Sequence, residues 1–366
     1  MDQEIRFCTA ADGTRLACAE SGAGRPLVKS AHWLTHLGHD WTSPIWRHQH
    51  LGLSGRFRLT RYDQRGCGLS DHDVADMSFD TWIGDLETVV DSAGLDRFVL
   101  LGMSQGGPIA IEYAVRHPER VSHLVLYGSY VRGRRFWREG GDTAREADTL
   151  LELIRLGWSR ENPAFRQVFS SLFIPGGNLE QIQQFNELQR SSTSAENAAR
   201  IVTVIDSLDV TEAARRLRVP TLVMHCEGDA RIPFSEGRHL AGEIPGARFV
   251  PLQGKNHIML EGEPAWDRFM NELVRFTEAE PARRPDVPAG GGHRGRLTSL
   301  TAREKDVLAL VATGMGNAAI AESLHLSPKT VRNYLTRILD KLEVASRGEA
   351  IVAAREAGLG VSRPER

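Results

Sequence analysis

Apolar and polar residues form two different patterns along the first 280 residues. Short apolar runs predict strands, whereas apolar residues spaced three or four positions apart predict helices. The predicted strands are two within residues 5–30 joined at Asp12-Gly13, then 27–31, 58–62, 98–101, 121–127, 220–225 and 247–251. The predicted helices between them are 79–93, 108–114 and 264–276. Because strands and helices alternate, the pattern predicts an α/β fold with a mostly parallel sheet covered on both faces.

Residues 129–218 depart from this alternation. They are helical in character and carry many large apolar side chains. These side chains include Phe136, Trp137, Trp158, Phe165, Phe169, Phe173 and Phe185. We interpret the stretch as a helical cap inserted over the edge of the sheet. Most of its aromatic residues are expected to pack within the cap, and a minority to line a pocket.

The pattern changes again after residue 277. Residues 278–296 hold three prolines and a Gly-Gly-Gly run with almost no large apolar residue, which is typical of a flexible linker. Four short helices are predicted beyond it, at about 302–313, 318–324, 328–342 and 346–357. We therefore expect a large domain at 1–277, a linker at 278–296 and a small all-α domain at 297–366.

Charge separates the two predicted domains. The whole chain has a net charge of −2, but residues 293–366 carry 12 Lys and Arg and 8 Asp and Glu, whereas residues 1–292 carry 33 and 39. A basic end on an acidic body favours a nucleic-acid partner at that end, although a charged helix face is often only solvated.

Cysteine usage and hydropathy restrict the class of protein. The four cysteines, Cys8, Cys18, Cys67 and Cys226, include no C-x-x-C pair, which argues against a zinc site or a disulfide framework. The N-terminus lacks the apolar core of a signal peptide, and no apolar run reaches the length of a membrane span. We expect a cytoplasmic protein with no metal, no cofactor and no membrane partner.

Gly102, Ser104 and Gly106 form a G-x-S-x-G motif between a predicted strand and a predicted helix. The glycines leave room for a sharp turn that holds the Ser104 hydroxyl at the carboxyl edge of the sheet in a strained conformation. The backbone N–H of Gln105 would then point at a developing oxyanion. The alternative is a tight glycine-rich turn around a buried serine.

A serine hydroxyl needs a base, which is usually a histidine oriented by a carboxylate. Asp229 and His257 each follow a later predicted strand, in the stretches Glu227-Gly228-Asp229 and Gly254-Lys255-Asn256-His257. Singly they could be a turn aspartate and a loop histidine. Together with the motif they resemble the α/β-hydrolase fold family over roughly residues 5–277.

This resemblance implies a nucleophile at Ser104, a general base and acid at His257, and an orienting carboxylate at Asp229. Many members place His-Gly after the third strand, whereas this chain reads Ala31-His32-Trp33. The Trp33 N–H is the candidate second oxyanion donor beside that of Gln105. Loss of one such donor lowers turnover by about 10²–10³.

Two other groups of residues are predicted to have no chemical role. Asp63 and Arg65 are expected to form a buried turn network. Five histidines lie close together without a clear helical metal-binding spacing, so we interpret them as loop and surface residues. They are His32, His36, His39, His48 and His50.

The C-terminal helices have the signals of a helix-turn-helix. Thr301 and Glu304 form a capping box, and Ser327-Pro328 begins a helix whose outer face is polar and basic. The stretches 300–308, 319–321 and 327–333 resemble the LuxR-type DNA-binding domain. The alternative is a charged, solvated helical bundle.

The LuxR resemblance implies a double-stranded DNA partner and a division of labour on the third helix. It assigns base contacts to Arg332, Asn333 and Thr336, and phosphate contacts to Lys329, Thr330, Arg337 and Lys341. The fourth helix is the usual dimer surface of that family, so a homodimer is expected.

The two resemblances together favour a one-component transcriptional regulator. Its hydrolase-like domain would sense, and in an intermediate case slowly hydrolyse, a small organic effector. The alternative is an active serine esterase or lactonase with an accessory DNA-binding tail. The Ser, Asp and His residues keep this alternative open, and the departure at His32 counts against it.

Overall fold

The computed structural model describes residues 2–137, 142–278, 300–313, 315, 317–324, 326–342, 350 and 354. The chain divides into two compact units, Met1–Pro281 and Ala282–Arg366. Apart from Glu278, the last residue of helix α11, the predicted linker at 278–296 lies outside the described residues.

The N-terminal unit is built on one eight-stranded sheet with the order β1-β2-β4-β3-β5-β6-β7-β8. The strands are β1 (Glu4–Thr9), β2 (Arg15–Ser21), β3 (Pro26–Lys29), β4 (Arg58–Tyr62), β5 (Phe98–Met103), β6 (Val121–Tyr127), β7 (Thr221–Cys226) and β8 (Arg248–Leu252). The pairs β1–β2 and β2–β4 are antiparallel, and all the others are parallel. The sequence therefore predicted the mostly parallel sheet correctly.

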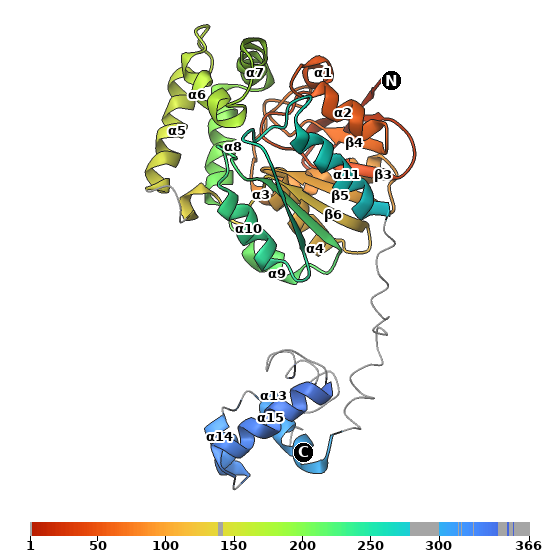
Figure 1. Cartoon of the computed structure of the whole chain (residues 1–366), viewed down its shortest axis with the longest axis vertical. Coiled ribbons are helices and arrows are strands. Elements are labelled where there is room, and N and C mark those ends of the chain that lie inside the picture. Colours follow the sequence, from red (N-terminus) through yellow and green to blue (C-terminus); the bar gives the residue numbers. More distant parts are fainter. Residues whose placement is uncertain are drawn as a thin grey trace. The chain divides into compact units, whose positions relative to one another are not determined.

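Helices cover both faces of this sheet (Figure 1). They are α1 (Leu37–Thr42), α2 (Arg47–Ser54), α3 (Phe79–Ser92), α4 (Gly106–Arg116), α10 (Phe234–Glu243) and α11 (Pro264–Glu278). The predicted cap at 129–218 contains the 3-10 helix η1 (Arg134–Phe136) and helices α5 (Thr143–Gly157), α6 (Ala164–Phe173), α7 (Leu179–Ser192), α8 (Ala195–Ser207) and α9 (Thr211–Arg216). No described helix combines the length and the apolar character needed to cross a membrane.

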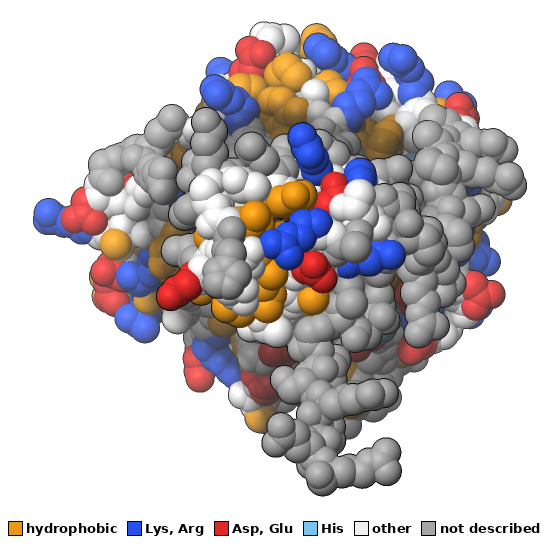
Figure 2. Space-filling view, turned by 90° about the horizontal axis from the view of Figure 1, so that it is seen from below, with side chains coloured by type: hydrophobic (Ala, Val, Ile, Leu, Met, Phe, Trp, Pro, Cys, Tyr) orange, Lys and Arg blue, Asp and Glu red, His pale blue; other side chains and the backbone are white. Residues whose placement is uncertain are grey.

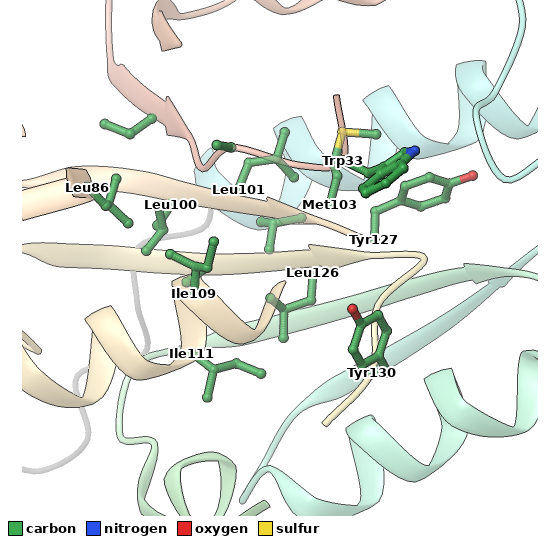
Figure 3. Packing of buried hydrophobic residues seen from close by; sticks show 14 of the residues in the cluster. Trp33, Leu86, Leu100, Leu101, Met103, Ile109, Ile111, Leu126, Tyr127 and Tyr130 are labelled. Atoms are coloured by element: carbon green, nitrogen blue, oxygen red, sulfur yellow. The ribbon is translucent and has the colours of Figure 1, made fainter. Parts of the chain in front are cut away.

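The core of this unit lies between the central strands and the helices that cover them. Figure 3 shows Leu100 and Leu101 of β5, Leu126 of β6 and Ile109 of α4, and all four are fully buried. Because β5 is buried over its whole length, it reads as a continuous apolar run rather than an alternating one. This rigid centre carries the loops that follow β3, β5, β7 and β8.

The C-terminal unit contains three described helices. They are α13 (Ala302–Ala312), α14 (Asn317–Ser323) and α15 (Pro328–Leu342). The predicted capping box is present, since the Thr301 hydroxyl accepts from the Glu304 N–H and the Glu304 carboxylate accepts from the Thr301 N–H. Val307, Ile320 and Ile338 belong to the apolar core that joins the helices. The predicted fourth helix at 346–357 lies outside the described residues except for Ala350 and Ala354.

Candidate functional site

Ser104 lies on a sharp turn between β5 and α4. Its φ is 51°, and only Leu34 shares a positive φ among the described residues other than glycine. A Cβ on Gly102 would lie 2.7 Å from the Gly107 Cα, and a Cβ on Gly106 would lie 2.5 Å from the Ser30 Oγ. Glycine is therefore required at both positions, and the strained serine predicted from the motif is present.

Asp229 and His257 are in direct contact after β7 and β8. The His257 Nδ1 lies 2.7 Å from the Asp229 Oδ2. The other carboxylate oxygen accepts from the N–H groups of Arg231 and Ile232, at 2.8 and 3.0 Å. Burial opposes ionisation of Asp229, but the charge of His257 and these hydrogen bonds hold its pKa below the ordinary value. The carboxylate is thus fixed in the orientation that an orienting residue needs.

The cap holds the loop that carries His257. The Phe173 carbonyl, at the end of α6, accepts from the N–H groups of His257 and Ile258 at 2.9 and 3.1 Å. The Phe173 ring also meets the His257 ring edge-on, with centroids 5.3 Å apart. The sequence pattern named Phe173 only as one of several cap aromatics, because a contact made by its backbone leaves no signature in the sequence.

The loop after β3 supplies the candidate oxyanion donors together with the start of α4. Trp33 and Gln105 are both buried. Within the described part of the chain, no acceptor is found for either backbone N–H. Leu34, directly after Trp33, has a φ of 58°. Both strained residues thus lie in the two turns that flank this site, at the carboxyl ends of β3 and β5, where α/β sheets bind ligands.

A buried polar network supports the Trp33 loop from behind. The Lys29 Nζ lies 2.9 Å from the His32 Nε2, and the His32 Nδ1 lies 3.0 Å from the Trp33 carbonyl oxygen. Burial and the nearby Arg61 lower the pKa of Lys29 to about 7. Burial and the charge of Lys29 hold the pKa of His32 well below its ordinary value. His32 therefore supports the Trp33 loop as a neutral side chain.

The prediction that the five histidines lie on the surface is wrong, although His32 and His36 do lie in a loop. His32 and His50 are buried, and the other three are partly buried in or beside α1 and α2. His50 contacts Arg61 of β4 at 3.0 Å and stacks on Trp46. These partners are distant in sequence or aromatic, so the local polar pattern of the segment concealed its burial.

Asp63 and Arg65 do belong to buried turn networks, but they do not contact each other. The Asp63 carboxylate accepts from the N–H groups of Leu37 and Leu69. Arg65 forms a bidentate pair with Asp85, at 2.6 and 2.8 Å. These contacts are structural in kind.

Two small cavities flank Ser104. Each has an interior of about 10 Å³, which is room for roughly one water molecule. The first is lined mainly by apolar side chains together with His32 and His257. The second extends toward the cap and is lined on its far side by Arg134, Asp206 and Arg231. A larger hollow of about 640 Å³ beside α8 contains none of the candidate catalytic residues, so chemistry points to the small cavities.

All seven predicted DNA-contact residues lie on α15. The Ser327 Oγ accepts from the Thr330 N–H at 3.1 Å, and Arg337 is exposed. The Lys341 ammonium contacts the Glu304 carboxylate, at 2.8 and 3.0 Å, and so joins α15 to the start of α13. The side chains of Lys329, Arg332, Asn333 and Thr336 lie outside the described part.

Charge on the described surface gives little further guidance. Where side chains are described, the face in Figure 2 mixes Lys and Arg with acidic and apolar groups. On this face the described side chains therefore do not outline a basic binding surface. The case for a nucleic-acid interface depends on the helix arrangement and on the comparisons below.

Comparison with known proteins finds relatives of the N-terminal unit. The putative carbamate hydrolase RutD of Azorhizobium caulinodans is 27% identical over 259 residues, which cover 70% of this chain and 92% of that protein. The pyrrolizixenacetamide deacetylase of Xenorhabdus hominickii is 25% identical over 259 residues, covering 69% and 87%. Among solved structures, an esterase from Exiguobacterium antarcticum matches with a TM-score of 0.64 at 24% identity, over 75% of this chain and all of that one.

Two family models match separate parts of the chain. Residues 37–264 match the α/β-hydrolase fold, and residues 298–354 match the bacterial regulatory proteins of the LuxR family. Both resemblances seen in the sequence are thereby confirmed. The chain belongs to the α/β-hydrolase fold family and carries a LuxR-family regulatory domain at its C-terminal end.

Proposed function

We propose that this protein is a transcriptional regulator whose hydrolase domain binds a small organic effector and whose C-terminal domain binds DNA. The observation that carries the proposal is the fusion of the two families in one chain. With a DNA-binding domain in the same chain, binding of a small molecule can change transcription, which an esterase without such a domain cannot do. Action on DNA also implies a cytoplasmic location.

The proposed chemistry of the hydrolase domain follows from the Ser104, His257 and Asp229 arrangement. His257 takes the proton of the Ser104 hydroxyl as the oxygen attacks an acyl carbon, and Asp229 stabilises the resulting imidazolium. The N–H groups of Trp33 and Gln105 donate to the oxyanion. His257 then protonates the leaving group, and water attack releases the acid. The printed names of the relatives, a carbamate hydrolase, a deacetylase and an esterase, support an ester, amide or carbamate as the bound compound.

An active esterase or lactonase with an accessory DNA-binding tail is the second candidate. The 2.7 Å contact between His257 and Asp229 and the two available N–H donors favour it. In this case the effector would be a substrate in rapid turnover. DNA binding would then have no dependence on it.

The proposed DNA complex is a dimer on a pseudo-palindromic site. The recognition residues are those implied by the LuxR family, with Arg332, Asn333 and Thr336 on the bases and Lys329, Thr330, Arg337 and Lys341 on the phosphates. The proposed dimer surface, 346–357, lies almost entirely outside the described residues.

A deletion strain complemented with variants of the full chain tests the regulator proposal. Transcript levels should change on deletion and return with the wild-type gene, but not with Arg332→Ala. The purified Arg332→Ala protein should lose about 1–3 kcal/mol of preference for the operator over random DNA. Unchanged transcripts, together with rapid ester hydrolysis that is lost in Ser104→Ala, would instead favour the accessory-tail enzyme.

A further inference from the structure

The second cavity beside Ser104 is unusually polar for a space inside an apolar cap. Arg134 of η1, Asp206 of α8 and Arg231 of the loop after Asp229 all line it, and each is less than one-tenth exposed. Trp33 and Tyr130, which line the same cavity, lie at the carboxyl ends of the central strands in Figure 3. Charged groups from the cap and from the catalytic loop therefore meet next to the candidate nucleophile.

The charges in this cavity are not all paired at short range. Arg134 pairs with Glu146 at 3.2 Å, although the Glu146 side chain is half exposed. Among the described residues, Arg231 and Asp206 line the cavity without an ion-pair partner within 4 Å. Burial and the charge of Arg231 lower the pKa of Arg134 to about 10. Buried charges are costly unless they are paired, so the buried guanidinium of Arg231 favours an anionic partner in this cavity.

Part of the hydrogen-bonding capacity of the three groups is also unused, although both Nη atoms of Arg134 have acceptors. The buried Arg134 Nε has no partner. Within the described part of the chain, the Arg231 guanidinium contacts only the face of Phe173, 5.4 Å from the ring centroid, and the Asp206 carboxylate has neither a hydrogen bond nor an ion pair within 4 Å. A buried donor without a partner, beside charged groups that line the same space, is more typical of a ligand site than of a packed core.

Arg231 is positioned together with the catalytic group. Its backbone N–H donates to the Asp229 Oδ1 at 2.8 Å, and its carbonyl oxygen accepts from the Arg134 Nη2 at 3.2 Å. The two arginines and Asp229 therefore form one connected unit. A group bound by these arginines would be held at a set place relative to Ser104.

We propose that this cavity, defined by Arg134, Asp206 and Arg231, binds a carboxylate carried by the acyl part of the compound that Ser104 attacks. The ligand class is a half-ester or half-amide of a dicarboxylic acid, or a lactone of a hydroxydicarboxylic acid. Guanidinium groups recognise carboxylates through paired N–H donors, which suits Arg231 and Arg134. Asp206 offsets part of their positive charge while the cavity is empty. The site deepens the proposed function, since it specifies the class of effector.

Matched esters test the proposal with the full-length protein. Mono-p-nitrophenyl glutarate carries the carboxylate, and p-nitrophenyl pentanoate has the same acyl length without it. Attack by Ser104 releases p-nitrophenolate from either ester, and water then frees the acid. The wild type should prefer the charged ester, and Arg231→Gln and Arg134→Gln should each lower the ratio of the two kcat/KM values about tenfold. Arg231→Lys should restore part of the ratio, which separates loss of charge from misfolding.

Arg135→Gln provides the matched control, because Arg135 is the neighbour of Arg134 and pairs with Asp148 at the surface. It should leave the ratio unchanged. Two results would overturn the proposal: a wild-type preference for the neutral ester, or the same ratio of kcat/KM values in Arg231→Gln as in Arg135→Gln. Neither result would contradict hydrolysis by Ser104.

A binding measurement separates failure of this site from failure of hydrolysis. Glutarate and pentanamide are titrated into Ser104→Ala protein and followed by tryptophan fluorescence, since Trp33 and Trp137 line the cavity. Glutarate should bind to this protein and pentanamide should not. A double variant that carries Arg231→Gln as well as Ser104→Ala should no longer bind glutarate. If neither ester is hydrolysed but this pattern holds, the anion site stands and only the catalytic function fails. If glutarate does not bind, the anion site is refuted.

Discussion

The backbone of Ser104 is strained in the position that the fold gives it. Its φ of 51° lies in the left-handed region, which costs a residue with a Cβ about 1–2 kcal/mol. Gly102 and Gly106 relieve the crowding around the turn but cannot change the conformation of the serine itself. The fold around β5 and α4 therefore has to hold this residue in place.

The strain predicts a difference between two inactive variants. Both Ser104→Ala and Ser104→Gly remove the hydroxyl, but only glycine adopts a positive φ without steric cost. Ser104→Gly should therefore unfold at a higher urea concentration, with a free energy of unfolding about 1 kcal/mol above that of Ser104→Ala. Equal midpoints and slopes for the two proteins would show that relief of strain is no larger than the extra chain entropy that glycine loses on folding.

At the scale of elements, Lys341 has a structural role in addition to its proposed phosphate contact, because it joins α15 to α13. Its ammonium group bonds both oxygens of Glu304, and the same carboxylate caps the Thr301 N–H. These bonds, first that to Lys341 and then that to the backbone, hold the pKa of Glu304 below its ordinary value of 4.5.

This lowered pKa predicts how the helix pair responds to acid. A carboxylate whose folded pKa is depressed contributes stability above its unfolded pKa and loses it as the pH falls through the folded value. Lys341→Ala removes the main cause of the depression, so the start of α13 should loosen at a higher pH than in the wild type. Amide hydrogen exchange of α13 in the full chain between pH 6 and 3 measures this. Arg337→Ala, an exposed position on the same helix, is the control and should follow the wild-type profile.

The sequence specified some elements far better than others. Strand β6 and helix α15 have the predicted bounds, because a long buried run and a capped amphipathic helix are strong local signals. Helices α1 and α2 were missed, since they are short and the polar His50 of α2 is buried against Arg61 of β4. The candidate triad was predicted from order and spacing, whereas Arg134, Asp206 and Arg231 were not. Only the folded cap brings those three to one cavity.

At the scale of the whole molecule, the proposal requires that ligand and DNA influence each other. A ligand that reorganises the cap at 129–218 can act on DNA binding only through its different affinities for two arrangements of the protein. We expect a modest coupling of about 1–3 kcal/mol, and linkage makes it reciprocal. Titration calorimetry with and without operator DNA should thus give ligand affinities that differ by the same factor as the DNA affinities. Identical ligand affinities in the two titrations would rule out allosteric control.

The small size of the cavities beside Ser104 also has a consequence for timing. A space with room for about one water molecule admits a larger compound only after the residues around it move. Where this movement is slower than binding, its rate limits how quickly a rising signal is sensed. The same rate limits escape, so a captured molecule persists after its supply has ended. A regulator of this kind would filter out brief pulses and keep a record of sustained ones.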